Sequence, residues 1–403
     1  MAAFVAGGAV TGTVGWSGHP LAFAFGIALP ALWAFAPSRT VAALVALAHF
    51  LGASRGLPEG ASNFFGAQLA IGLGLWVAAS LMFVAVHAAL WTPRGGWHRP
   101  LCFAIVAVLM SVPPFGIVGW AHPITAAGIL FPGWAWFGLA VTFVLLLAMT
   151  TRAWPVAAGI ATLAFALSAS SWTPPRAPDG WNGIDTAFRF ERAGQQADFA
   201  QQLATIRMVK TAAGEGARVA VLPESAMGFW TATTERLWSD ELAGVDIAVI
   251  GAGALVDPDG YDNVMVGLEQ FQEKWEPVFR PELRRNHRSG QGARILYRER
   301  MPVPVSMWQP WSTGGAHAHF FANPVYEFAG LTVAPLICYE QLIVWPVIQS
   351  MVFSPDVLVA TGNAWWTGGT NIVAIQRASA EAWASLFGIP LVMAFNEPGG
   401  RND

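Results

Sequence analysis

Two side chains whose chemistry suits acyl transfer occur at the ends of apolar runs. Cys338 lies in the stretch 331–340, and Glu224 follows the run 218–222. Short apolar runs rich in β-branched residues predict buried strands, so both side chains are expected at the carboxyl end of a strand. A thiol becomes a good nucleophile once a base removes its proton, and a carboxylate in a partly desolvated cleft can act as that base. The two residues together therefore suggest thioester chemistry.

Each residue also has a simpler interpretation. A lone cysteine in an apolar strand is most often a small buried hydrophobe. A glutamate at a strand end often caps a helix or faces solvent. A catalytic role is favoured because both Cys338 and Glu224 are expected at carboxyl ends of strands. Ligands of open α/β sheets bind beyond these ends.

Charge divides the chain of 403 residues near residue 172. Only six charged residues, five arginines and Glu59, occur up to Trp172, whereas 41 follow it, and the two parts carry net charges of +4 and −7. The mean hydropathy of +0.46 is too high for an ordinary soluble protein. We expect a transmembrane helical bundle at 1–172, a Pro- and Gly-rich linker at 173–184 and a separate domain at 185–403.

The first part contains several segments that are long and apolar enough to cross a bilayer, for which about 20 residues are needed. Two shorter segments, 1–16 and 40–53, are tilted spans, re-entrant segments or packed helices, which gives five to seven spans in all. The five long segments are 20–36, 64–91, 101–120, 124–150 and 153–172.

The basic loops predict the orientation of this bundle, because arginine and lysine are retained on the cytoplasmic side. Arg94 and Arg99 precede the span that starts at Leu101, and Arg152 precedes the last span. Two spans separate these loops, so both can face the cytoplasm. The last span then runs outward, which places the polar domain in the periplasm of a bacterial inner membrane.

Strand-like and helix-like segments alternate in the polar domain, which predicts a layered α/β fold. An Arg-rich section, 276–323, is expected to be irregular. The expected strands are 186–190, 218–222, 246–250, 262–267, the Cys338 strand, 357–360 and 390–394, and the expected helices are 195–213, 231–242 and 369–386.

Four short motifs occur in the order of one known family. Together they resemble the carbon-nitrogen hydrolase (nitrilase) superfamily, and with the bundle before them they look like apolipoprotein N-acyltransferases. The closer likeness is to the TraB family of conjugal transfer proteins. The resemblance implies a nitrilase-type α-β-β-α sandwich and a Glu-Lys-Cys triad. The motifs are Leu-Pro-Glu-Ser-Ala at 222–226, Tyr-Arg-Glu-Arg at 297–300, Leu-Ile-Cys-Tyr-Glu at 336–340 and Gly-Asn-Ala-Trp-Trp at 362–366.

The resemblance assigns roles to individual residues of this chain. Glu224 falls on the general base, Cys338 on the nucleophile, and Glu340 on the carboxylate that follows the nucleophile and supports the site. We expect no cofactor and no metal, since the pair His317 and His319 has no third ligand nearby. The expected substrate pocket consists of Tyr339, Asn363, Trp365 and Trp366.

The family lysine is where the sequence departs from the pattern. The chain has two lysines, Lys210 and Lys274, and Glu299 stands at the lysine position of the motif. Its neighbours Arg298 and Arg300 are the residues that we expect to supply positive charge near an oxyanion. An arginine keeps its proton and has a planar head, so it is not equivalent to lysine.

Seven arginines lie between Arg280 and Arg300, and they either contact phosphate groups or form a solvated lid. Trp308, Trp311 and the pair Phe320–Phe321 would make that lid apolar on its inner face. Direct nucleic-acid binding is not expected, because the domain has a net charge of −7 and no recognition motif.

Two functions follow from these observations. The first is a membrane-anchored, Cys-dependent amide hydrolase or acyltransferase at the periplasmic membrane face, associated with plasmid conjugal transfer. Its partners would be the lipid membrane, an acyl or amide substrate, and conjugation or envelope proteins. The second is a catalytically silent membrane scaffold, which the loss of the lysine favours.

Overall fold

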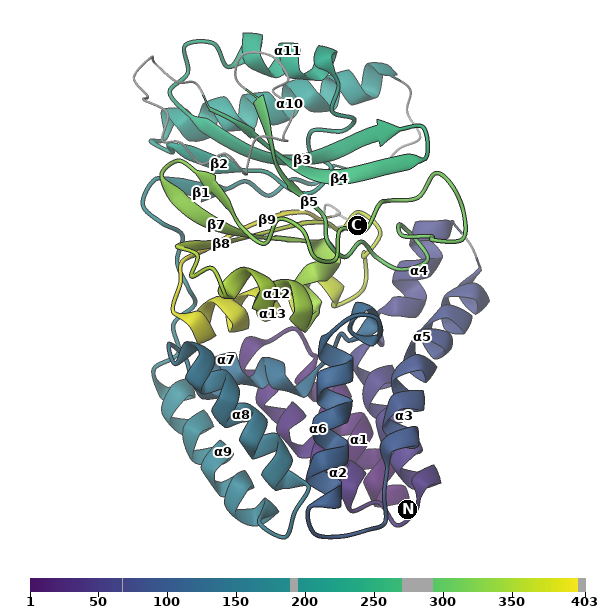
Figure 1. The fold of residues 1–403 in the computed structure, drawn as a ribbon. Coiled ribbons are helices and arrows are strands. Elements are labelled where there is room, and N and C mark those ends of the chain that lie inside the picture. Colours follow the sequence, from purple (N-terminus) through teal and green to yellow (C-terminus); the bar gives the residue numbers. More distant parts are fainter. Residues whose placement is uncertain (67, 189–194, 270–292, 398–403) are drawn as a thin grey trace. The chain divides into compact units, whose positions relative to one another are not determined.

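The computed structural model describes residues 1–66, 68–188, 195–269 and 293–397 (Figure 1). By internal contacts the chain forms two compact units. The first unit contains residues 1–175, 341–348 and 366–389, and the second contains 176–340, 349–365 and 390–403. The candidate nucleophile and the candidate base both lie in the second unit.

Helices make up the first unit. The 3-10 turns η1 and η3 begin at prolines, which suit the first position of a helix because the missing N–H would have no partner there. The elements are α1 (Ala2–Gly15), η1 (Pro20–Ala28), α2 (Leu29–Ala34), α3 (Arg39–Ala53), α4 (Leu57–Phe65), α5 (Leu69–Leu90), α6 (His98–Ser111), η2 (Phe115–Val118), η3 (Pro123–Ala126), α7 (Ala127–Leu130), α8 (Ala135–Met149), α9 (Trp154–Ser170) and α13 (Ile372–Phe387).

Two of the apolar segments expected to be long enough to span, 101–120 and 124–150, are not continuous helices, whereas 20–36 contains η1 running directly into α2. Prolines at 113, 114 and 132 interrupt the two discontinuous segments, because the residue before a proline avoids helical geometry. Among the described residues, only α5 is by itself long and apolar enough to cross a bilayer. The pair α3 and α4, which meet at a bend of 56°, would make a second such segment.

Small residues bring helices of this unit into close contact. A side chain at Gly8 or Gly12 of α1 would overlap the backbone carbonyls of Val45 or His49 in α3. The spacing of the two glycines is that of a small-xxx-small motif, which lets helix backbones approach closely in membranes. Apolar side chains also remain exposed on outer helix faces: on α5 Leu69, Ile71, Leu73, Val77, Leu81 and Met82, and on α9 Val156, Ile160, Leu163 and Leu167.

Two short Arg-containing loops connect helices at one end of the first unit. The loop with Arg94 joins α5 to α6, and the loop with Arg152 joins α8 to α9. Figure 1 shows both loops at the end of the unit where the N-terminus lies.

The second unit is built on two sheets. One has the order β1-β2-β3-β4-β5 and the other β6-β7-β8-β9. Strands β7, β8 and β9 are parallel, so their carboxyl ends meet at one edge. The strands are β1 (Trp181–Gly183), β2 (Val219–Val221), β3 (Ala248–Asp257), β4 (Gly260–Leu268), β5 (Ala293–Arg298), β6 (Tyr326–Phe328), β7 (Leu331–Ile337), β8 (Val357–Asn363) and β9 (Leu391–Asn396).

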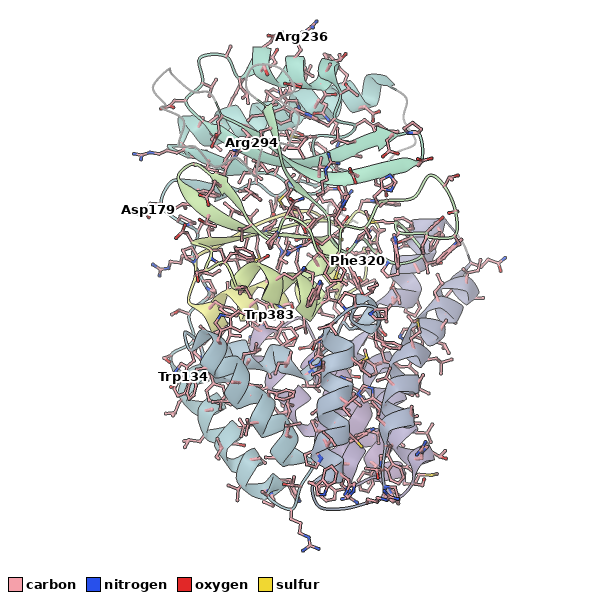
Figure 2. All side chains as sticks on the ribbon, viewed as in Figure 1. Trp134, Asp179, Arg236, Arg294, Phe320 and Trp383 are labelled. Carbon is pink, nitrogen blue, oxygen red and sulfur yellow. The ribbon has the colours of Figure 1, made fainter. Side chains whose placement is uncertain are left out.

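The two sheets of the second unit pack face to face through a buried apolar layer that includes Ile250, Ile337 and Val359. The helices α10 (Gln195–Gly214) and α11 (Ala232–Glu241) cover the other face of the first sheet (Figure 1), packing Val209 and Trp238 against it. Arg236 projects from α11 away from the sheet (Figure 2). These layers are the α-β-β part of the expected sandwich.

Most expected elements of the polar domain exist within one to a few residues of their predicted ends. The strand expected at 186–190 is wrong, because Trp181–Gly183 pairs with β2 instead and Thr186 makes only an isolated bridge to Asn396. β5, β6 and the helix α12 (Val344–Met351) were not predicted. Part of the Arg-rich section, including Arg280, Arg284, Arg285 and Arg288, lies outside the described residues, as does Lys274.

Candidate functional site

The structure brings Glu224 and Cys338 into direct contact. The Cys338 thiol donates a hydrogen bond to the Glu224 carboxylate. Both side chains are buried, each 5% exposed. The expectation that the two strand ends meet is therefore met in the geometry of the second unit.

Local backbone geometry presents both residues. Cys338 follows β7 directly and has φ +47°, at the start of the 3-10 turn η5 (Cys338–Leu342). Glu224 follows β2, and Ser225 after it has φ +63°. A left-handed conformation is unfavourable for residues other than glycine and is found preferentially at functional sites.

Three groups hold the Glu224 carboxylate. Besides the thiol, the Asn263 side-chain amide donates to Oε1 at 2.8 Å and the Asn363 backbone N–H donates to Oε2 at 3.0 Å. Burial raises the pKa of Glu224, and these three hydrogen bonds act against that rise. A carboxylate with a raised pKa beside a thiol is a suitable proton acceptor.

Glu340 is an anchor rather than a group at the thiol. Its Oε1 accepts from the Tyr297 hydroxyl at 2.6 Å, the Arg300 N–H at 2.8 Å and the Met301 N–H at 3.1 Å. Its Oε2 accepts from the Ile337 N–H at 2.8 Å. The side chain is fully buried, and it ties the end of β5 to the turn that carries Cys338.

The two arginines expected near an oxyanion have other partners. Arg300 is fully buried and donates to the Tyr297 hydroxyl, the Pro335 carbonyl and the Ser350 hydroxyl. Arg298 forms an ion pair with Asp262. Within the described part of the chain, no recorded contact joins either arginine to Glu224.

The residue at the lysine position enters the site as a carboxylic acid. Glu299 is 1% exposed, and its Oε2 accepts from the Asn263 amide at 2.9 Å, the same amide that bonds Glu224. Burial and the negative charges of Glu224 and Glu340 raise its pKa well above the ordinary value. Sequence reasoning missed Asn263, although a polar residue inside the apolar run 262–267 was a usable signal.

The expected pocket residues lie at different places. The Asn363 backbone N–H donates to Glu224, while the Asn363 side-chain oxygen accepts from the Asn396 amide at 2.9 Å. Tyr339, directly after Cys338, and Trp365, two residues after Asn363, are half-buried. Trp366 belongs to the first unit, where its ring is edge-on to Phe64 of α4 at 6.2 Å.

The remaining candidates from the sequence have local roles. His317 bonds Asp257 at 2.9 Å and His319 bonds Asp262 at 2.6 Å, and the described residues contain no cluster suited to a metal ion. Phe320, labelled in Figure 2, is edge-on to Trp308 at 5.4 Å. Trp311 and Phe321 are largely exposed, at 68% and 74%.

One protein-family model matches the part of the chain that contains Cys338. The family model described as "Carbon-nitrogen hydrolase" matches residues 275–385. Among solved structures, the chain is similar to a Nesterenkonia AN1 amidase from the nitrilase superfamily, at 14% identity and a TM-score of 0.36, covering 55% of this chain and 78% of that one.

Curated relatives match nearly the whole chain. A conjugal transfer protein TraB of Agrobacterium fabrum is 51% identical, covering 96% of this chain and 90% of the relative. A probable conjugal transfer protein TraB of Sinorhizobium fredii is 50% identical, covering 96% of each. The chain belongs to the family of TraB conjugal transfer proteins, as the sequence motifs predicted.

Proposed function

We propose that this protein is a Cys-dependent amide hydrolase or acyltransferase that works through a thioester on Cys338. The observation that carries the proposal is the hydrogen bond from the buried Cys338 thiol to the Glu224 carboxylate. Such a pair is the arrangement that activates a thiol, because the base lies within reach of the proton it must take.

The proposed reaction uses this pair twice. Glu224 takes the thiol proton while the sulfur attacks the substrate carbonyl carbon. The tetrahedral intermediate collapses when Glu224 returns the proton to the leaving amine or alcohol, which leaves an acyl group on Cys338. Water or an amine then attacks the thioester with Glu224 again as base, and the thiol is restored. Glu340 acts as a positioning residue for the turn that holds Cys338.

We further propose that residues 1–172 form a transmembrane bundle of five to seven spans, and that 173–184 form a linker whose last residues, Trp181–Gly183, join the sheet as β1. The domain 185–403 would act at the periplasmic face of a bacterial inner membrane. Support comes from the exposed apolar faces of α5 and α9, which would be costly in water. The close α1–α3 contact agrees with helix packing of the kind found in membranes. The shared position of the two Arg-containing loops agrees with the proposed orientation.

The biological setting that we propose is plasmid conjugal transfer, because the relatives at about half identity carry that description. The proposed partners are membrane lipid, an acyl or amide substrate at the membrane surface, and proteins of the conjugation apparatus or envelope. Trp311 and Phe321 are suitable contacts for an apolar acyl chain, since both aromatic side chains are largely exposed.

A second candidate is a scaffold without activity that binds the same partners. The observation that favours it is Glu299, a carboxylic acid at the position where the family resemblance implies a lysine. A hydrolase site without the lysine cation needs another group to stabilise the oxyanion of the tetrahedral intermediate.

Thiol acylation separates the two candidates. Membranes containing the full chain, with Cys102 replaced by serine so that Cys338 is the sole thiol, are treated with a p-nitrophenyl ester of a short fatty acid and analysed by intact mass. The enzyme proposal predicts one adduct on Cys338 and its loss in Glu224→Gln. If no adduct forms and Cys338→Ala leaves conjugation frequency unchanged, the scaffold is the better account.

Topology is tested separately. An alkaline phosphatase fused after Trp172 is active only outside the cytoplasm, so the proposed orientation predicts high activity. A fusion after Arg94 provides the matched control and is expected to be inactive. The reverse pattern would refute the orientation and leave the chemistry untouched.

A further inference from the structure

We propose that Glu299 is a catalytic residue that remains protonated and donates a hydrogen bond from Oε1 to the oxyanion formed when Cys338 attacks an acyl substrate. This inference rests on the proposed function. It gives the site a neutral acid as the oxyanion donor in place of a cation.

Strand pairing places Glu299 beside the base. In the antiparallel pair β4–β5, Val264 lies opposite Arg298 and Met265 opposite Tyr297. The Glu299 N–H donates to the Asn263 carbonyl at 2.8 Å, which continues this register by one residue. Directly opposed residues project to the same face of a sheet, so the Asn263 and Glu299 side chains meet there.

One amide group therefore bridges two buried carboxyl groups. The two hydrogens of the Asn263 amide go to Glu224 Oε1 at 2.8 Å and to Glu299 Oε2 at 2.9 Å. Two carboxylates so close in a water-poor site cannot both be ionised without a large electrostatic cost. At least one of the two carboxyl groups carries a proton.

The hydrogen bonds decide which of the two is protonated. Glu224 accepts from three donors, the Asn263 amide, the Asn363 N–H and the Cys338 thiol. Glu299 accepts from the Asn263 amide alone among the described residues. Donors stabilise an ionised carboxylate, so the charge resides on Glu224 and the proton on Glu299. The strongly raised pKa of Glu299 agrees with this assignment.

The protonated group has one unused atom. Glu299 Oε1 is buried and has no hydrogen-bond partner in the described part of the chain. A proton on Oε1 provides a buried O–H that lacks an acceptor, which is costly at rest. A carboxylic acid kept neutral in this way can donate to a developing oxyanion.

The described lysine and the two arginines that flank Glu299 in the chain have partners other than Glu224 and Glu299, although Arg300 Nη1 itself is buried without a hydrogen-bond partner among the described residues. Lys210 pairs with Glu241 at 2.7 Å, Arg298 with Asp262, and Arg300 with the Tyr297 hydroxyl and its neighbours. The other lysine, Lys274, lies outside the described residues and is therefore included in the test.

The proton balance of the step is simple. The Cys338 proton moves to Glu224, the carbon–sulfur bond forms, and the carbonyl π electrons move onto oxygen, which accepts a hydrogen bond from Glu299. When the carbon–nitrogen or carbon–oxygen bond breaks, the proton on Glu224 goes to the leaving group. Glu299 keeps its proton throughout.

The experiment measures the rate of Cys338 acylation by the p-nitrophenyl ester across pH, using the full chain with Cys102→Ser. Glu299→Gln retains both functions of the neutral acid, an oxygen that accepts from Asn263 and N–H groups that donate. Its rate is expected within about tenfold of the parent at neutral pH. Glu299→Leu has no donor, so its rate is expected to fall about 100-fold or more, as for loss of one oxyanion donor.

The pH profile adds a readout that a structural role would not change. The parent rate should fall at alkaline pH as Glu299 ionises, and Glu299→Gln should lack that decline. The inference is refuted if Gln and Leu variants are equally slow, if the Leu variant reacts like the parent, or if both parent and Gln variant lose activity with the same alkaline midpoint. A 100-fold loss in Lys274→Ala would also refute it, because a lysine would then be the donor.

The two proposals fail in different ways. A parent chain that is not acylated on Cys338 overturns the proposed function and this inference with it. Acylation that depends on Glu224 and is insensitive to Glu299 leaves the function standing and removes only the role of Glu299. If Glu299→Leu does not fold, the pH profiles of the parent and of Glu299→Gln still decide.

Discussion

Replacement of Glu340 by glutamine should destabilise the second unit strongly. The carboxylate accepts from Tyr297, Ile337 and two further backbone N–H groups, at 2.6 to 3.1 Å, and it is fully buried. A glutamine NH2 cannot accept, so at least one of these donors is left without a partner, at a cost of about 1–3 kcal/mol. Arg300, also fully buried and 3.9 Å from the carboxylate, loses its counter-charge, and breaking a buried pair costs about 3–5 kcal/mol.

We expect a total loss of about 3–5 kcal/mol, because the two effects share the same group and do not add. For a unit of this size, that loss corresponds to a fall in Tm on the order of 10 °C. Thermal unfolding of the detergent-solubilised chain measures the shift, and Glu215→Gln, at an exposed position of similar chemistry, is the matched control. Cys338 acylation should slow in parallel because Glu340 holds its turn. A Tm within about 2 °C of the parent would show that Glu340 does not anchor this region.

Three further outcomes follow from the structure. The pKa of Glu299 is raised above its ordinary value of 4.5, so above pH 4.5 the folded state retains a proton that the unfolded chain releases. The free energy of unfolding should therefore fall by about 1.4 kcal/mol per pH unit from pH 4.5 up to the pKa of Glu299 in the folded state. Glu299→Gln should remove this pH dependence in a series of Tm measurements. Gly12→Ala should cost about 1–3 kcal/mol by pushing α1 from α3, whereas Gly74→Ala, in open space on α5, should cost nothing measurable by the same melting assay. Lys210→Ala removes a half-exposed ion pair with Glu241 and should change the unfolding free energy by less than about 1 kcal/mol in urea titration; a larger loss would contradict the surface assignment.

Local pattern was sufficient to find the candidate thiol and base. The runs before Glu224 and Cys338 are apolar and short, and both form buried strands, β2 and β7. Helices α10 and α11 were also predictable from their sequences. These elements are determined by residues close together in the sequence, and the spacing of apolar residues along the chain predicts such elements.

The register between strands that are distant in the chain could not be predicted from the sequence. The pairing of Asn263 with Glu299 depends on how β4 meets β5, and a bulge at Met265/Val266 shifts that register by one residue. The same holds for Arg300, whose neighbours Ser350 and Pro335 come from distant parts of the chain. In the first unit, overall hydrophobicity predicted apolar segments correctly but concealed the breaks at prolines, because composition over 20 residues is insensitive to a single proline.

The charges around Glu299 predict how the acylation rate depends on salt. Arg300 and Glu340 compensate each other. The remaining acidic groups of the site are Glu224, which accepts from the thiol, and Glu299, which shares the Asn263 amide with Glu224. When Cys338 gives up its proton to Glu224, the negative charge moves to sulfur, and both Glu224 and Glu299 are then neutral acids with O–H groups. Hydrogen bonds of this kind strengthen where water is excluded, although they provide less stabilisation than a cation would. We therefore expect slow acylation that varies little with ionic strength, since an uncharged donor is not screened by salt. A marked decrease of the rate with added salt would point instead to a cation at the oxyanion.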